Sequence, residues 1–143
     1  MTVSQLSVFV ENKPGKLVQA IEALAGADVD IRALSLSDTA DFGILRMIVD
    51  QPELALSIYK EIGYLVKRNE VIAISVGDIP GGLAIVLRVL AASGVDLEYT
   101  YAFARNSHDS AFVVICVTDN DEAVRVLRMY GIQILTPDEV YGL

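Results

Sequence analysis

The sequence of 143 residues has few of the side chains on which metal and redox sites depend: one cysteine, one histidine and no tryptophan. A lone Cys116 cannot form an internal disulfide, and its place in the apolar run AFVVICV predicts a buried, inert thiol. With His108 as the only other strong ligand, a zinc or copper site lacks donors, so we expect no metal and no cofactor. His108 itself stands in the polar segment RNSHDS, which predicts a solvated loop.

Positive charge is also scarce. The chain carries 11 Lys and Arg against 19 Asp and Glu, which gives a formal net charge of −8 and a pI of about 4.5. Such a chain repels a phosphate backbone instead of neutralising it. Nucleic acid is therefore not an expected partner.

Long uninterrupted apolar runs are missing too, although 53% of the residues are hydrophobic. The most membrane-like segment, Gly81 to Leu97, contains Arg88 and Gly94, so a buried helix fits it better than a membrane span of about 20 residues. The N-terminal MTVSQLSVFV has no basic region and no cleavage-like site, which predicts a strand and not a signal peptide. We therefore expect a cytoplasmic protein with no membrane contact.

The sequence does contain an internal repeat, in which one unit occurs twice. Residues 11–17 read ENKPGKL and residues 77–83, 66 positions later, read GDIPGGL. Over the twenty positions from Asn12 this shift gives seven identities, where average composition would give about one or two. The identical pairs are Pro14/Pro80, Gly15/Gly81, Leu17/Leu83, Leu24/Leu90, Ala25/Ala91, Val29/Val95 and Asp30/Asp96. Further on the shift becomes 68, which places two extra residues near Arg105 to Asp109, in an expected hairpin loop.

Periodicity predicts the same order of elements in each copy. The first copy reads as strands at 6–10, 31–37, 43–49 and 64–67, with helices from 17 to about 26 and from 52 to 63. The second reads as strands at 71–76, 97–104, 111–117 and 132–135, with helices at 81–92 and 121–130. This βαββαβ order is that of the ferredoxin-like fold, an antiparallel sheet with both helices on one face.

We therefore predict an α+β protein of two ferredoxin-like repeats, residues 1–69 and 70–143, packed side by side. Strand residues that point away from the helices, such as Phe9, are often apolar. A sheet face of that kind usually meets a partner, so we also expect a homodimer.

The repeated Pro-Gly turn suits a bound anion. The proline fixes φ, the glycine lets another group approach the backbone, and the helix that follows presents free N–H groups with a partial positive charge. Such a loop can bind a carboxylate. The alternative is that Asn12 and Asp78, three residues before each glycine, serve only to cap the helices.

A second acid stands at the start of the second strand of each copy, Asp30 in DVDIRAL and Asp96 in GVDLEYT. Its simplest role would be to end the turn after the helix. A ligand with a carboxylate and an ammonium group, however, needs N–H donors at one end and a carboxylate or amide oxygen at the other. Free amino acids are ligands of this kind.

These segments, with their N/D-x-P-G-x-L turn and V-D-I or V-D-L strand start, resemble the ACT domain, the small amino-acid-sensing module of phosphoglycerate dehydrogenase, aspartate kinase and related enzymes. The resemblance covers essentially the whole chain as two tandem copies, which leaves nothing for a catalytic domain. It implies that ACT copies pair edge to edge through their second strands and bind amino acids at that junction. Asp30 and Asp96 stand where the dehydrogenase has Asn, which argues against its ligand, serine.

The resemblance implies two ligand-binding sites, which we call seats. Each lies between the turn of one copy and the second strand of the other. The predicted ligand-binding residues are Asn12, Pro14, Gly15, Lys16, Leu17, Asp96 and Leu97 for one seat, and Asp78, Pro80, Gly81, Gly82, Leu83, Asp30 and Ile31 for the other. Because Asn12 can donate and accept whereas Asp78 can only accept, we expect the two seats to differ in affinity.

The expected function is a non-catalytic sensor that binds a free amino acid and passes its occupancy on allosterically, possible partners being a regulated enzyme or another protein. The main alternative is a ligand-free dimerisation or partner-binding module of the same fold. An acylphosphatase-like enzyme would need an Arg inside the anion-binding loop, where this sequence has Lys16 or Gly82. Metal carriage on this fold would need paired cysteines.

Overall fold

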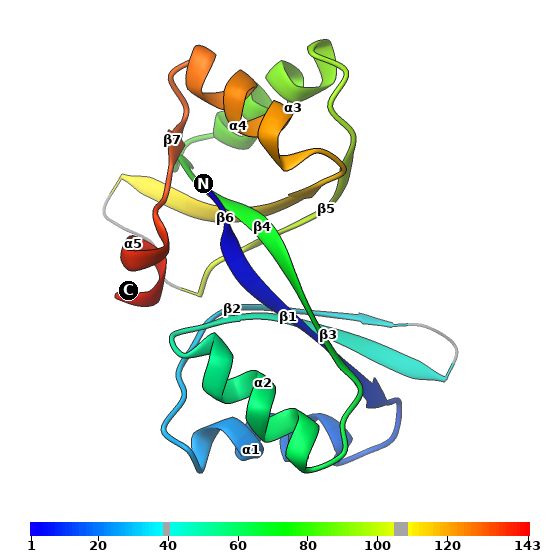
Figure 1. Cartoon of the computed structure of the whole chain (residues 1–143). Coiled ribbons are helices and arrows are strands. Elements are labelled where there is room, and N and C mark those ends of the chain that lie inside the picture. Colours follow the sequence, from blue (N-terminus) through cyan, green and yellow to red (C-terminus); the bar gives the residue numbers. More distant parts are fainter. Residues whose placement is uncertain (39–40, 105–108) are drawn as a thin grey trace. The chain divides into compact units, whose positions relative to one another are not determined.

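The computed structural model describes residues 1–38, 41–104 and 109–143. The predicted loop around His108 and the extra residues of the second copy fall largely on 105–108, outside the described residues. The chain divides into two compact units (Figure 1). We call Ser4–Asn69 the first repeat, and Met1–Val3 together with Glu70–Leu143 the second repeat.

The first repeat is a four-stranded antiparallel sheet with two helices on one face (Figure 1). Its elements are β1 (Val3–Glu11), α1 (Lys16–Ala25), β2 (Ile31–Asp38), β3 (Phe42–Val49), α2 (Pro52–Glu61) and the beginning of β4 (Val66–Gly77). The strand order is β2-β3-β1-β4, with β2 at the edge.

The second repeat has the same order, β5-β6-β4-β7. It consists of the rest of β4, then α3 (Gly82–Ala92), β5 (Leu97–Ala102), β6 (Ser110–Val117), α4 (Asn120–Met129), β7 (Gln133–Ile134) and α5 (Pro137–Tyr141). Figure 1 shows α3 and α4 on one side of this sheet and α5 on the other. The predicted ferredoxin-like α+β architecture is therefore confirmed for both repeats.

Each repeat has its own core between its sheet and its helices. In the first, register pairs Leu6 with Met47 and Val8 with Leu45, so alternate residues of β1 and β3 form one buried face. This face packs against α1 and α2, and Tyr59 of α2 donates a hydrogen bond from its hydroxyl to the Ala20 carbonyl at 2.7 Å. The second core is built likewise. Cys116, predicted to be buried, lies on β6 with 6% of its surface exposed.

Two features differ from the sequence prediction. The separate strands predicted at 64–67 and 71–76 are one continuous strand, β4, of 12 residues. The expected boundary between residues 69 and 70, where the two compact units also divide, therefore lies inside a strand. The short helix α5 was not predicted. It begins with a capping box, in which Thr136 accepts a hydrogen bond from the Glu139 N–H and the Glu139 carboxylate accepts one from the Thr136 N–H.

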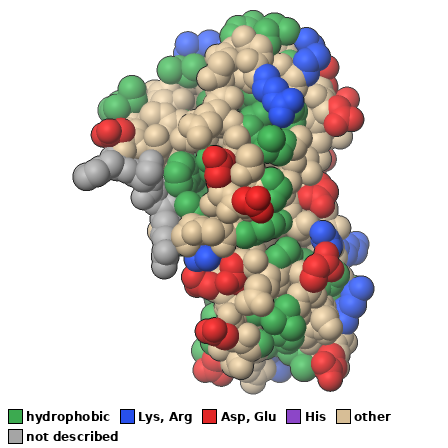
Figure 2. Space-filling model, turned by 60° about the vertical axis from the view of Figure 1, so that its left-hand side comes forward, with side chains coloured by type: hydrophobic (Ala, Val, Ile, Leu, Met, Phe, Trp, Pro, Cys, Tyr) green, Lys and Arg blue, Asp and Glu red, His purple; other side chains and the backbone are tan. Residues whose placement is uncertain are grey.

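Lys and Arg side chains are interspersed with Asp and Glu on the face drawn in Figure 2. None of the helices in the described part of the chain is long and apolar enough to cross a membrane. Within the same residues, no three His, Cys, Asp or Glu side chains gather as they would around a metal ion.

Candidate ligand-binding site

The turn after β1 exposes the beginning of α1. Gly15 is the N-cap of this helix and has φ 85°, a left-handed conformation that favours glycine. The Lys16 N–H bonds to the Lys13 carbonyl and the Gln19 N–H to the Gly15 carbonyl, each at 3.2 Å. The two N–H groups between them, on Leu17 and Val18, have no acceptor among the described residues. They are the free donors that the Pro-Gly turn predicted.

Asn12 is held by the edge strand and not by the helix. Its Nδ2 donates to Asp38 Oδ1 at 3.0 Å, and its backbone N–H donates to the Asp41 carbonyl at 3.2 Å. Because the amide bonds to Asp38, the alternative that Asn12 is the cap of α1 finds no support in the contacts of the described residues. The Asn12–Asp38 pair instead closes one end of a small cavity.

This cavity, which we call the turn cavity, has a volume of about 290 Å³. Its lining combines the Asn12–Asp38 pair with the apolar side chains of Leu17 and Leu36, which are 37% and 49% exposed. The complete lining is Val10, Glu11, Asn12, Lys13, Leu17, Leu36, Asp38 and Gly43. A small molecule in it would meet both polar groups and aliphatic side chains.

Asp30 lies far from the turn of its own repeat. It directly precedes β2 whereas Asp38 ends this strand, and at about 3.3 Å per residue the two acids are roughly 25 Å apart. Its carboxylate accepts a hydrogen bond from Arg32 at 2.7 Å, and its N–H donates to Asp50 Oδ1 at 2.9 Å. A single repeat therefore does not bring the turn and the second acid together. The half-buried Ile31 begins β2 beside it.

The second repeat has the same turn, but different residues surround it. Gly81 is the N-cap of α3 with φ 85°, and the Asp78 N–H donates to the Asp109 carbonyl as Asn12 does to Asp41. The residue 66 positions after Asp38, however, is Ala104, which offers Asp78 no polar partner. The predicted residues Pro80, Gly81 and Asp96 are exposed, and Leu83 and Leu97 are half-buried.

Gly82 makes this second turn tighter than the first. A Cβ placed on Gly82 would lie 2.1 Å from the Gly77 carbonyl oxygen, whereas the corresponding Lys16 carries a full side chain. The two turns, predicted to be unequal from Asn12 and Asp78, thus also differ in the space beside the first helical residue.

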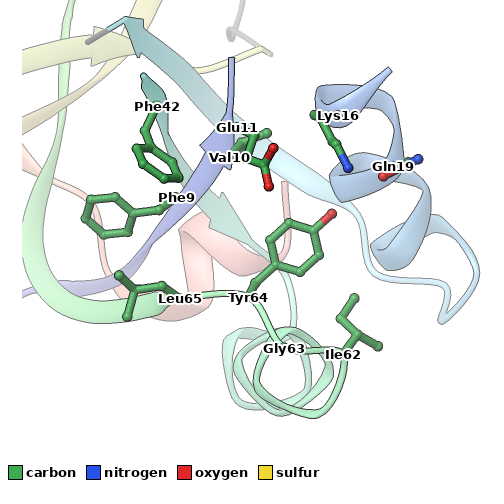
Figure 3. A pocket seen from close by; sticks show the side chains of 10 residues that line it. All are labelled: Phe9, Val10, Glu11, Lys16, Gln19, Phe42, Ile62, Gly63, Tyr64 and Leu65. Atoms are coloured by element: carbon green, nitrogen blue, oxygen red, sulfur yellow. The ribbon is translucent and has the colours of Figure 1, made fainter. Parts of the chain in front are cut away.

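A larger cavity lies next to the turn cavity and shares Val10 and Glu11 with it (Figure 3). We call it the aromatic cavity; its volume is about 550 Å³. Its lining is Phe9, Val10, Glu11, Lys16, Gln19, Phe42, Ile62, Gly63, Tyr64 and Leu65. Lys16, predicted to belong to the turn seat, lines this second cavity.

Comparison with known families shows to which protein family the chain belongs. The model of the family described as an ACT domain pair matches residues 1–139. The chain belongs to this family. The resemblance drawn from ENKPGKL and GDIPGGL is thereby confirmed.

Solved structures agree with the family. Protein BT0572 from Bacteroides thetaiotaomicron is 40% identical, with a TM-score of 0.93, and the match covers 100% of this chain and 98% of that one. The regulatory subunit of aspartate kinase from Thermus thermophilus shares the fold at 18% identity and a TM-score of 0.62, over 88% of this chain and 91% of that one. None of the functionally curated proteins matches.

In this ACT domain pair the structure brings some of the predicted residues together and separates others. Asn12 and Leu17 line one cavity, whereas Lys16 lines its neighbour and Asp30 lies at the far end of β2. The turn cavity also contains Asp38 and Leu36, which the sequence analysis did not name. The spacing of Leu34 and Leu36 on an edge strand is the only sequence signal that could have pointed to this wall.

Proposed function

We propose that this ACT domain pair binds a free amino acid at the turn of the first repeat and that occupancy regulates an enzyme or another protein. The observation that carries the proposal is the turn cavity, whose lining combines the Asn12–Asp38 pair with Leu17, the first of the two residues at the beginning of α1 with an unbonded N–H group. The N–H groups would donate hydrogen bonds to the ligand carboxylate, which the helix dipole also favours. The oxygens of Asn12 and Asp38 would accept its ammonium group.

The second strand of another ACT copy completes the seat in this proposal. Strands β2 and β5 are the edge strands of their sheets, so each has backbone groups available for pairing. Pairing would bring Asp96 and Leu97 towards the first turn, and Asp30 and Ile31 towards the second turn at Pro80 to Leu83. We propose a homodimer for the same reason, because Leu34 and Leu36 of β2 are 43% and 49% exposed.

Relatives of this fold support a regulatory role. One similar structure is described as the regulatory subunit of aspartate kinase, in a ligand-free form. We propose, as the sequence predicted, that this chain also acts in the cytoplasm without catalysing a reaction itself, and that ligand binding alters its affinity for a partner. A coupling of about 1–3 kcal/mol would suffice.

The proposal is tested by measuring the melting temperature of the protein in the presence of each of the twenty amino acids at millimolar concentration. A ligand at a hundred times its dissociation constant adds about 2.7 kcal/mol of stability, which raises the melting temperature by several degrees. We expect one amino acid, or a few related ones, to do this. Asn12→Ala should remove the rise, and Asp78→Ala, its matched control in the second repeat, should retain most of it.

A flat response across all twenty amino acids would contradict the sensor and favour a ligand-free pairing module. The exposed leucines of the edge strand β2 are the observation behind that second candidate. Sedimentation equilibrium then becomes the decisive measurement. Leu36→Lys should dissociate the dimer, whereas Leu54→Lys, on an exposed position of α2, should leave it intact.

A further inference from the structure

The aromatic cavity of the first repeat takes no part in the proposed amino-acid site. We propose that it is a second binding site, for a small carboxylic acid with an apolar, ring-containing body. Its volume of about 550 Å³ lies within the range of roughly 300–1,000 Å³ that is common for small-molecule sites. It is formed entirely within Ser4–Asn69.

The cavity has a polar side and an apolar side. Figure 3 shows the ends of Lys16 and Gln19 and the hydroxyl of Tyr64 on one side, with Phe9 and Phe42 on the other. Phe42 and Leu65, which both line the cavity, are 47% and 61% exposed, a large apolar area for two side chains to leave in water. A ligand with a ring would cover this area, and its polar end would lie among the donors.

The charge on the polar side favours an anion. Glu11 already has a cationic partner, because Lys13 Nζ lies 3.4 Å from its Oε2. Lys16, in contrast, forms no ion pair with any described residue. Lys16 is also the first residue of α1, so the partial positive charge at the beginning of the helix adds to that of its ammonium group.

The polar groups around Lys16 can donate hydrogen bonds to the same anion. Gln19 carries two amide N–H donors, and Tyr64 carries a hydroxyl that faces the cavity in Figure 3. A carboxylate can accept from all three side chains because each of its oxygens has two lone pairs. The ligand needs no ammonium group, since the nearest carboxylate, Glu11, is paired with Lys13.

The second repeat provides an internal comparison. A cavity of about 320 Å³ lies at the corresponding place, and most of its lining residues have counterparts in the lining of the aromatic cavity. In the order Phe9, Glu11, Lys16, Gln19, Phe42, Tyr64 and Leu65, the second repeat has Ser75, Gly77, Gly82, Ile85, Ser110, Ile132 and Gln133. The fold thus forms a cavity at this place in both repeats, but only the cavity of the first repeat is lined by a cation and aromatic rings.

The site is tested by calorimetric titration of the whole protein with three probes of one shape, 3-phenylpropionate, phenylalanine and 2-phenylethylamine. We expect 3-phenylpropionate to bind best, because it carries the carboxylate without the ammonium group. Lys16→Met should weaken its binding at least tenfold. The matched control Lys60→Met, a lysine outside the cavity in the last turn of α2, should leave binding unchanged.

Three results would overturn the proposal: no binding of 3-phenylpropionate at millimolar concentration, equal binding by Lys16→Met, or tighter binding of 2-phenylethylamine. Phe42→Ala gives a second variant, with an exposed residue changed, and should weaken 3-phenylpropionate while thermal melting shows that the fold is kept. Because 3-phenylpropionate is not among the twenty amino acids, this test and that of the proposed sensor fail independently.

Discussion

At the scale of single residues, Tyr59 joins the two helices of the first repeat. It is fully buried, its hydroxyl donates to the Ala20 carbonyl at 2.7 Å, and its ring meets Tyr64 edge-on at 5.3 Å between centroids. Burial raises the pKa of the Tyr59 phenol well above its usual range. The residue 68 positions later is Leu127, so the second core fills the same place without a hydroxyl.

Tyr59→Phe should lower the free energy of unfolding at pH 7 by about 1 kcal/mol, the usual net contribution of one hydrogen bond. The phenol pKa is raised in the folded state, so the contribution of Tyr59 is complete below about pH 10 and is lost as the pH rises further, where the unfolded chain ionises. Urea unfolding at pH 7 and above pH 10 measures both effects. If the wild type and Tyr59→Phe lost equal free energy of unfolding at high pH, the assignment of the effect to Tyr59 would be contradicted.

Glycine has two different roles in the repeated turns. The sequence suggested that Gly15 and Gly81 leave room for a ligand, and the space around both is indeed open, but their φ of 85° is by itself a reason for glycine. Gly82 has a third reason, because a Cβ on it would meet the Gly77 carbonyl oxygen at 2.1 Å. Only the last of these reasons depends on a contact that no local pattern reveals.

Gly82→Ala should therefore cost about 1–3 kcal/mol or more, because backbone must move to relieve the clash. Gly26→Ala is the matched control: its φ is −64°, and the nearest atom to its Cβ would be the Glu22 carbonyl oxygen at an ordinary 3.5 Å. We expect this control to be neutral or slightly stabilising. Chemical denaturation of both variants measures the difference, and equal losses of stability would contradict the role given to the Gly77 carbonyl.

At the scale of elements, the regular alternation and helical spacing predicted every strand and the four long helices, because each signal is local. The sequence did not predict that β4 is one continuous strand, because Arg68, Asn69 and Glu70 interrupt the apolar pattern. The strand continues through these three residues. Helix α5 was missed because only Val140 among its five residues is buried, which gives no periodicity.

The capping box of α5 can be tested directly. Thr136→Ala removes the oxygen that accepts from the Glu139 N–H, and it should lower the free energy of unfolding by about 1 kcal/mol. Thr136→Ser keeps that oxygen and should keep the stability. If urea denaturation finds the two variants equal, the helix is held by Val140 alone and the cap contributes nothing.

The candidate site divides in the same way between local and non-local signals. The turn from Glu11 to Leu17 could be predicted from its own seven consecutive residues. The aromatic cavity could not, because Phe42 joins it through its register with Glu11, and Tyr64 joins it after an intervening helix. Such a cavity becomes visible only once the order of the strands is known.

At the scale of the whole molecule, the two repeats have separate cores but share one strand. Strand β4 begins in one repeat and ends in the other, so loss of either sheet would leave part of β4 without its hydrogen-bonding neighbours. We therefore expect a single cooperative unfolding transition, with calorimetric and van't Hoff enthalpies equal.

Core variants of each repeat provide the check. Leu45→Ala in the first core and Ile115→Ala in the second remove fully buried side chains, and each should cost about 2–5 kcal/mol. By scanning calorimetry, both should lower the temperature of the same transition. A variant that splits the transition into two would show that the repeats unfold separately.

The division of the chain also bears on how the protein is made. Residues 1–3 are synthesised before the first repeat but belong to the second. During translation Ser4–Asn69 leaves the ribosome before Glu70 and the rest of the second repeat. Met1–Val3, in contrast, must wait until the chain has been extended through Glu70 and beyond, so a segment that is synthesised before the first repeat reaches its native neighbours after that repeat has been made.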